Sequence, residues 1–385
     1  MGVSALNNPN VLAYDGTPGL YTTRLYVRHD QPLLRGAGKR LANLDITKAA
    51  IRTNTAAKAL SAHRNLILLD VFRDYAAWFR VSEQLRSQQA IRAKAEEIYN
   101  IVREKTEKRQ MPITDLNTMK VTMAGQDVAI LNLHTARRNR CQALLFTALN
   151  EPEEAAVPDY VPATSPKDVM AVFQLPGPTD TLAKAVATDL TLLAQETDVA
   201  ILEEDCYKAF NDRRPELTLS VQGGVDGYAA GGWSDSTRDL SSRQYDVLLS
   251  VALALPITDR AARSKLIELT ARKEQLQILI IQRRNEIQHI IAELYRNLEE
   301  VQKRRTLNEQ IVALSRENLN NEMQRLIAGK STVLDTVVYQ TDLIQAELDL
   351  VQTLAEYMNL VGDCYALRGE MELLVDMKQE FTGGR

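Results

Sequence analysis

Apolar residues recur at helical spacing along two long segments, Lys39–Met111 and Ile257–Ala328, and neither segment contains a Gly or a Pro. A continuous helix of either length would extend roughly 110 Å at a rise of 1.5 Å per residue. In the second segment the apolar positions are separated by three, four or seven residues, the spacing of helices that pack along their length. They are Leu266, Leu269, Leu276, Ile280, Ile287, Ile291, Leu294, Leu298 and Val301. The pattern predicts two helices far longer than those of ordinary compact domains.

The first long segment carries two apolar stripes instead of one. The first stripe comprises Leu60, Ile67, Val71, Trp78, Val81 and Leu85. The second comprises Leu68, Phe72, Tyr75 and Phe79 and lies about 100° further round the helix. One stripe would suit a two-stranded coiled coil. Two adjacent stripes predict a helix with neighbours on both sides, as in a bundle or a closed ring of helices.

The two halves of the chain repeat the same order of parts. The stretch Leu25–Lys39 aligns with Leu249–Arg263 at an offset of 224, and Ile113–Leu116 aligns with Val333–Thr336 at an offset of 220. Each repeat is predicted to form a strand, a long helix, a tight turn and a returning helix. The sequence therefore indicates an internal duplication in a mainly α fold with a small β part and very long antiparallel helical hairpins.

This organisation predicts four regions. Residues 1–150 form the first repeat, and residues 151–178, which hold half of the twelve prolines, form an extended connector. Residues 179–370 form the second repeat, and residues 371–385 a C-terminal tail. We expect the returning helix that ends near Asn150 to stack end to end with a helix at 179–212 beside one of the long helices.

A switch to a period of two predicts strands at Leu217–Val225 and Tyr245–Pro256, and a third strand begins near Tyr21. The predicted Gly-rich loop between the first two overlaps the end of the Leu217–Val225 strand and holds Gly223, Gly224, Gly227, Gly231 and Gly232. Strands of about ten residues match the length of a tilted transmembrane β-strand. A soluble hairpin packed on a core is equally consistent with the periodicity.

Composition and motifs argue against several classes of function. The net charge of −4 gives no support to a nucleic-acid partner. No nucleophile–base pair, phosphate-binding loop or metal-ligand cluster is visible, so the sequence predicts neither an enzyme nor a bound metal or cofactor. The three cysteines, Cys141, Cys206 and Cys364, are expected to be small packed side chains.

No signal peptide is visible after Met1, which favours either a soluble elongated coiled-coil scaffold in the cytosol or a natural start further upstream.

In order and spacing, five motifs resemble the outer-membrane efflux proteins, of which TolC is the type. They are Gln31–Gly36, Leu255–Ile257, Ile113–Leu116, Ala328–Asp335 and Ala355–Gly362. The resemblance covers roughly residues 20–370. It implies a homotrimer in which each subunit adds four strands to a twelve-stranded β-barrel in the outer membrane, while the helices form an α-barrel tunnel across the periplasm.

The resemblance also implies a function and partners. The protein would be a passive exit duct of a tripartite efflux or type I secretion system. The turn ends of its helices would meet a periplasmic adaptor (membrane fusion) protein, which opens the tunnel and links it to an inner-membrane pump. The transported substrate is then set by the pump and is not readable from this chain.

Family members place acidic residues at the tunnel entrance, and the matching positions of this sequence are Asp115 and Asp335. The resemblance therefore implies that these two aspartates lie at the entrance. In a trimer each would form a ring of three carboxylates whose negative potential favours cations at a narrow aperture. Val338 stands where some family members have a second acid, so this entrance is expected to be less negative. The alternative role of both aspartates is to stabilise a helix N-terminus.

The turns themselves are the candidate docking surface for the adaptor. Gly329 fits the turn glycine of the family, whereas Arg109 stands where that glycine is usual, and Pro112 lies within the first turn. We therefore expect the docking geometry of the first turn to depart from that of the family. The candidate docking residues are Arg109, Pro112, Ile113, Thr114, Gly329, Lys330 and Ser331.

One departure concerns the start of the chain. The first repeat has no counterpart of the helix at 179–212 or of the strand Leu217–Val225. We expect a helical segment, a first strand and a signal peptide to be encoded upstream of Met1. The chain itself would then supply about three strands, and the returning helix Thr336–Arg368 would lack its stacking partner.

Overall fold

The computed structural model describes residues 2–8, 20–149, 160–162, 175–229, 233–240, 245–255 and 260–373. Most of the predicted connector, most of the predicted tail, and the residues Pro256 and Ile257 lie outside this described part. The chain divides into two compact units. One combines Met1–Thr55 with Ala194–Ile280, and the other combines Ala56–Leu193 with Ile281–Arg385.

Two very long helices dominate the chain, as predicted. Helix α2 runs from Leu44 to Glu107, and helix α8 runs from Arg260 to Ile327. The first long segment is not one unbroken helix, because the short helix α1, Lys39–Ala42, is separated from α2 at Asn43.

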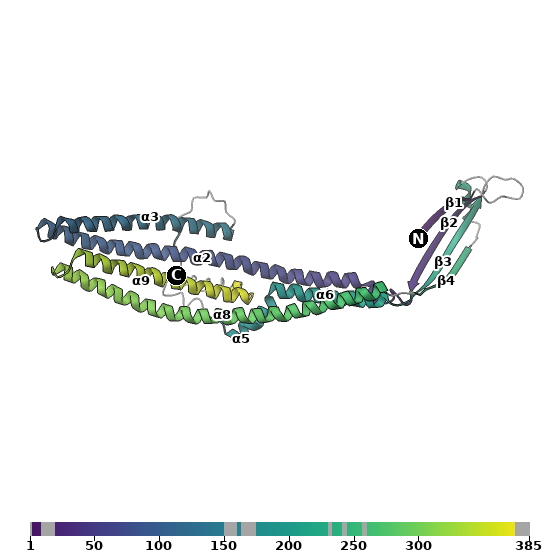
Figure 1. Ribbon diagram of the computed structural model, residues 1–385. Coiled ribbons are helices and arrows are strands. Elements are labelled where there is room, and N and C mark those ends of the chain that lie inside the picture. The colour runs from purple at the N-terminus through teal and green to yellow at the C-terminus, as the bar shows by residue number, and fades with distance from the viewer. Residues whose placement is uncertain are drawn as a thin grey trace. The chain divides into compact units, whose positions relative to one another are not determined.

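Each long helix is followed by a tight turn and a returning helix. Helix α3 covers Ile113–Leu149, and helix α9 covers Val333–Leu367. In the second unit, α2 and α9 lie between α3 and α8 (Figure 1). The α2–α3 and α8–α9 pairs are the two helical hairpins of the chain.

In α2, Phe72 and Phe79 of the second predicted stripe are buried, and so are Trp78, Val81 and Leu85 of the first. One cluster joins α2 to α8 and α9 through Leu69, Phe72, Phe79, Leu294, Leu298, Tyr357, Met358 and Val361. A second cluster near the turns joins all four helices through Ala95, Ile98, Val102, Leu116, Met119, Leu326 and Val333. Leu60 and Ile67, the first members of the predicted stripe, are exposed in the single chain.

The predicted helix at 179–212 is divided at Asp189 into α5, Pro178–Thr188, and α6, Leu190–Asp212. Helix α5 meets the end of α9, not the end of α3, so the expected stacking with the first returning helix is wrong. The hydroxyl of Thr188 donates to the carbonyl of Leu367 at 2.9 Å. Helix α9 therefore has a stacking partner within the chain, contrary to expectation.

A small polar cluster fixes this α5–α9 junction. Arg368 pairs with Asp180 at 2.7 Å, and the hydroxyl of Thr181 lies 2.9 Å from that of Tyr295. Burial raises the pKa of Tyr295 to about 12, so its hydroxyl stays protonated and donates to the carbonyl of Pro176 at 2.6 Å. These contacts join residues that are far apart in the sequence, which explains why periodicity alone misassigned the partner.

The first unit contains an antiparallel sheet in the order β1-β2-β3-β4 (Figure 1). Its strands are Gly2–Asn8, Leu20–Pro32, Glu216–Ala229 and Tyr245–Ala254. The expectation that the first strand lies upstream of Met1 is therefore wrong, because β1 pairs with β2 along its whole length. The described chain supplies four strands, not three.

Three of the glycines that were predicted to form a loop lie inside β3 instead. At two of them, close neighbours leave little room for a side chain. A Cβ at Gly227 would lie 2.1 Å from the carbonyl oxygen of Ser236 in helix α7, Trp233–Asp239. A Cβ at Gly224 would lie 2.5 Å from a carboxylate oxygen of Asp246. Gly223 is the third; Gly231 and Gly232 fall outside the described residues.

Candidate functional site

The two helical turns have the same backbone hydrogen bonds. In the first, the N–H groups of Lys108, Arg109 and Gln110 donate to the carbonyls of Glu104, Thr106 and Lys105 at 3.1, 2.9 and 2.8 Å. In the second, those of Ala328, Gly329 and Lys330 donate to Gln324, Leu326 and Arg325 at 3.0, 3.1 and 2.8 Å. This is the Schellman pattern that satisfies the free carbonyls of a helix end.

The residue in the left-handed conformation is Gly329 in the second turn and Arg109 in the first, with φ of 72° and 57°. Glycine adopts this region without strain, whereas a residue with a Cβ does so at a conformational cost. The first turn therefore keeps the backbone of a glycine turn although it presents a long cationic side chain.

The start of α9 explains one of the two predicted entrance acids. Thr332 is the N-cap: its hydroxyl accepts the N–H of Asp335 at 3.2 Å, and the Asp335 carboxylate accepts the N–H of Thr332 at 3.3 Å. This reciprocal arrangement is a capping box. The hydrogen bonds from Thr332 hold the pKa of Asp335 below its ordinary value. Asp335 is exposed, so it carries its charge at the surface while it stabilises the helix.

The first hairpin begins differently. Pro112 stands at the position of Thr332, and the N–H of Asp115 donates to the carbonyl of Pro112 at 3.2 Å. Asp115 is half-buried, whereas the neighbouring Ile113 is exposed. The two predicted acids thus hold equivalent positions in the two hairpins but have different surroundings.

The turns lie close enough to share a cavity of about 490 Å³. It brings together three of the predicted residues, Asp115, Gly329 and Ser331. The other lining residues are Lys105, Gln110, Met111, Ile327, Ala328 and Thr332. The sequence placed these residues on two separate hairpins, and the fold gathers them at one end of the helices.

Lys105 links the two turns, and the sequence analysis missed it. Its ammonium group donates to the carbonyls of Leu326 at 2.7 Å and Ile327 at 2.6 Å, at the end of α8. A helix leaves its last carbonyls without intrahelical partners, and a cation is favourable at this negative end. The available signal was position: Lys105 stands two residues before the end of α2.

A second group that the sequence analysis missed is the buried carboxylate of Glu322, which is 4% exposed. It accepts hydrogen bonds from the hydroxyl of Ser331 and from Arg325, the latter at 3.1 Å. The predicted docking residue Ser331 therefore ties the second turn to α8. The heptad pattern gave a signal, because Glu322 occupies a core position between Leu319 and Leu326.

The sheet of the first unit has one charged and one apolar face. On the charged face, Arg24 of β2 donates to both carboxylate oxygens of Asp226 at 2.6 and 2.7 Å and pairs with Asp246 of β4 at 3.4 Å. The opposite face is exposed and apolar. Its members are Leu25, Val27, Val221, Tyr245, Val247, Leu249, Val251 and Leu253.

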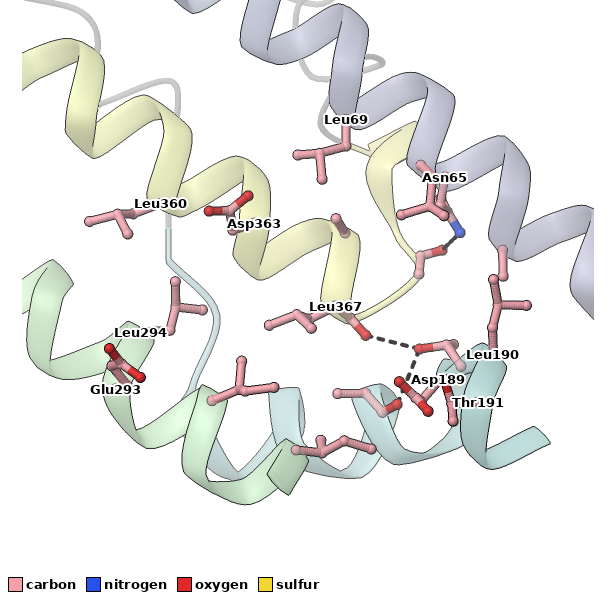
Figure 2. Close-up of a pocket in the computed structure, with 18 of the residues that line it drawn as sticks. Asn65, Leu69, Asp189, Leu190, Thr191, Glu293, Leu294, Leu360, Asp363 and Leu367 are labelled. Carbon is pink, nitrogen blue, oxygen red and sulfur yellow. Dashed lines mark hydrogen bonds between the residues drawn. The ribbon is translucent and has the colours of Figure 1, made fainter. Parts of the chain in front are cut away.

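A larger cavity of about 580 Å³ lies in the second unit where α5 gives way to α6. Figure 2 shows Asp189, Leu190 and Thr191 on one side of it and Leu360, Asp363 and Leu367 of α9 on another. Arg283 pairs with Asp189 at 2.8 Å. The sequence gave no signal for this cavity, which forms at the gap between α9 and the start of α6.

Within the ranges that the structure describes, no group of three or more His, Cys, Asp or Glu side chains could hold a metal ion. In the same ranges, none of the helices combines the length and the hydrophobicity needed to cross a membrane. Of the three cysteines, which were expected to be packed side chains, Cys141 and Cys364 are buried and Cys206 is half-buried.

No protein-family model matches the sequence, and no curated protein matches it. The fold, however, is similar to solved outer-membrane channels. The outer membrane protein VceC from Vibrio cholerae has a TM-score of 0.69 at 16% identity, over 96% of this chain and 85% of that chain. CusC, described for its transmembrane channel formation, has a TM-score of 0.71 at 13% identity, over 95% and 82%.

The MtrE outer membrane channel from Neisseria gonorrhoeae has a TM-score of 0.69 at 15% identity, over 96% of this chain and 79% of that chain. The chain therefore has the fold of these outer-membrane channels. The resemblance to this class, drawn from the turn and strand motifs, is confirmed at the level of the fold.

Proposed function

We propose that this protein is an outer-membrane exit duct of a tripartite efflux or type I secretion system. The observation that carries the proposal is the two-faced sheet joined to long helical hairpins. One sheet face exposes many apolar side chains suited to lipid, and the other carries charged groups suited to a water-filled lumen. The duct performs no chemistry and needs no cofactor.

A closed barrel follows if three copies assemble. Strands β1 and β4 are the edges of the sheet. An open edge in lipid would leave backbone N–H and C=O groups without partners. Pairing of β4 in one copy with β1 in the next removes these edges, and four strands from each of three copies make a twelve-stranded barrel.

The helices support the same assembly. The outer helix α3 exposes Val121, Val128 and Leu131, and the opposite outer helix α8 exposes Leu307, Ile311 and Leu314. Two different apolar flanks suit a head-to-tail contact, which closes into a ring when the rotation between copies is right. The resulting homotrimer would enclose an α-helical tunnel, with most of the chain in the periplasm and the sheet in the outer membrane.

The turn ends are the proposed entrance and docking surface. Rings of Asp115 and Asp335 carboxylates would attract cations at the aperture. A periplasmic adaptor would engage the exposed turn residues, which include Arg109 and Lys330, and shift the hairpins between two packings. The adaptor would connect the duct to an inner-membrane pump, which selects the substrate.

The test is to produce the natural full-length protein in a Gram-negative bacterium and follow it into membranes. We expect a detergent-extracted trimer that gives discrete, cation-selective conductance in planar lipid bilayers. A monomer that stays fully soluble without detergent and forms no channel would instead support the alternative, an elongated coiled-coil scaffold.

A further inference from the structure

The contact between Lys105 and the end of α8 has no counterpart at the end of α2. Lys105 donates to the carbonyls of Leu326 and Ile327, the last two residues of α8. The last two residues of α2 are Thr106 and Glu107. Within the residues that the structure describes, no side chain donates to either of their carbonyls.

The two sets of carbonyls are otherwise alike. The Thr106 carbonyl accepts the N–H of Arg109 at 2.9 Å, and the Leu326 carbonyl accepts the N–H of Gly329 at 3.1 Å. A carbonyl oxygen has two lone pairs, so each can take one more donor. At the end of α8 the additional donor is Lys105. At the end of α2, the carbonyls of Thr106 and Glu107 have no such side-chain donor among the described residues.

The other hairpin has a cation at the matching position. Arg325 stands two residues before the end of α8, as Lys105 does on α2. One of its nitrogens donates to Glu322 at 3.1 Å, and its side chain is 61% exposed. A guanidinium has five N–H donors, so Arg325 can bind a further acceptor without leaving Glu322.

We propose that Arg325 donates to the carbonyls of Thr106 and Glu107 in a second copy of this chain. The contact repeats between copies what Lys105 does within one copy. This inference rests on the proposed trimeric ring and names the residue that joins its subunits at the turn end. Around the ring, the helix ends would be capped alternately by Lys105 within a chain and by Arg325 between chains.

Two isoleucines further along the same helix faces show the same asymmetry. Ile91 lies fourteen residues before Lys105; it is 3% exposed and packs with Val312 and Leu343 of the second hairpin. Ile311 lies fourteen residues before Arg325 and is 49% exposed. Fourteen residues are two heptads, so each isoleucine shares a helix face with its cation. The face that α2 buries within the chain is therefore the face that α8 leaves for a neighbour.

The experiment is a thiol cross-link between two distinguishable copies. The natural full-length protein is produced with Cys141, Cys206 and Cys364 replaced by Ser. One copy carries Arg325→Cys, and a second copy with a tag of different mass carries Glu107→Cys. A bifunctional thiol reagent as long as an arginine side chain is added to the detergent-extracted protein. We expect a covalent species containing one copy of each mass.

Two matched controls use the same reagent. The pair Lys105→Cys and Ile327→Cys in one chain must link internally, because Lys105 reaches the Ile327 carbonyl within the chain. The pair Arg316→Cys and Glu107→Cys must not link. Arg316 is also 61% exposed on α8 but pairs with Glu347 of its own hairpin and lies nine residues, roughly 14 Å, further along the helix.

The outcomes separate this inference from the proposed function. If a trimer forms and the internal control links, but positions 325 and 107 do not, the inference is wrong and the duct stands. A cross-link from position 325 to a protein of another mass also overturns it. If no oligomer forms, the duct proposal itself fails. In a formed trimer, Arg325→Ala should lower the temperature at which subunits separate in detergent, Arg325→Lys should restore it, and Arg316→Ala should leave it unchanged.

Discussion

Arg109 and Gly329 occupy the same position in two turns 220 residues apart, with matching hydrogen bonds and the same left-handed backbone. The two turns differ in what this conformation costs. A left-handed backbone at a residue with a Cβ costs roughly 1–2 kcal/mol, whereas glycine adopts it freely. The first turn is therefore the more strained of the two, and its side chain is the candidate reason for retaining that strain.

The relative strain can be measured by exchanging the residue types. Arg109→Gly should raise the free energy of unfolding by about 1 kcal/mol, and Gly329→Ala should lower it by about 1 kcal/mol. A Cβ at Gly329 would meet no atom within 4 Å, so the loss of stability in Gly329→Ala measures only the conformational cost of the left-handed backbone. Denaturant unfolding followed by circular dichroism gives both values. A loss of stability in Arg109→Gly would contradict the explanation.

Asp335 combines a capping role with the proposed entrance charge, and two substitutions separate these roles. Asp335→Asn keeps an oxygen that can accept from the N–H of Thr332 but removes the charge; Asp335→Ala removes both. We expect both variants to weaken block of the channel by cations, and only Asp335→Ala to lower the unfolding temperature. Single-channel recording with a divalent cation, together with thermal unfolding, tests this pair. Unchanged block in both variants would remove Asp335 from the gate.

Gly362 of α9 lets α9 approach α2 closely. A Cβ there would lie 2.6 Å from Cδ1 of Phe72. Gly362→Ala should therefore destabilise the protein by about 1–3 kcal/mol through overpacking. Gly125→Ala is the control, because a Cβ at this helical position in α3 would meet nothing within 4 Å and should stabilise by roughly 0.5–1 kcal/mol. Chemical unfolding of both variants checks the difference in sign.

Asp189 predicts a dependence of stability on pH. It caps α6 by accepting the N–H of Leu192 at 2.7 Å, and it pairs with Arg283 of α8. Burial alone would raise the pKa of Asp189, but the hydrogen bonds from Arg283 and Leu192 outweigh burial and lower it. A lowered pKa adds stability above the unfolded value of about 3.9, and that stability is lost as the pH falls further through the folded value.

The measurement is the unfolding temperature of the wild type and of Asp189→Asn from pH 7 to pH 3. The wild type should be more stable at pH 7, and the difference should shrink as the pH falls below about 4. A difference that stays constant over this range would show that the carboxylate charge does not stabilise the junction.

The two faces of β4 offer a test of the membrane assignment with adjacent residues. Val251 lies on the apolar face, and Ser250 lies on the opposite face. Val251→Lys should destabilise the membrane-inserted form by about 2–4 kcal/mol if this position faces the bilayer midplane. Ser250→Lys should insert normally. The fraction of folded trimer in outer-membrane extracts, read from gel mobility before and after heating, compares them. Equal insertion of both variants would argue against lipid on the apolar face.

Much of the helical architecture could be predicted, because its signals are local. The absence of Gly and Pro and the heptad spacing located α2 and α8 to within a few residues. The turn motifs placed α3 and α9 equally well. The glycines of β3 were misread because glycine marks a turn or a close approach, and only the neighbours Ser236 and Asp246 decide which.

The candidate site was predicted in part. Asp115, Gly329 and Ser331 were expected at the turn ends and do share a cavity there. Lys105 and Glu322 were missed, because each acts on a partner that lies on another helix or across a turn. The place of Lys105 near a helix end and of Glu322 in the heptad pattern could mark these residues, but it does not identify their partners.

By itself the sequence determined that this chain forms two long helices with matched turns and returning helices, since periodicity, proline and glycine act over a few residues. Only the tertiary structure decided that α5 continues α9, that β1 completes the sheet, and that Lys105 caps α8. These outcomes depend on contacts between residues far apart in the chain, whose free energy is absent from any local pattern.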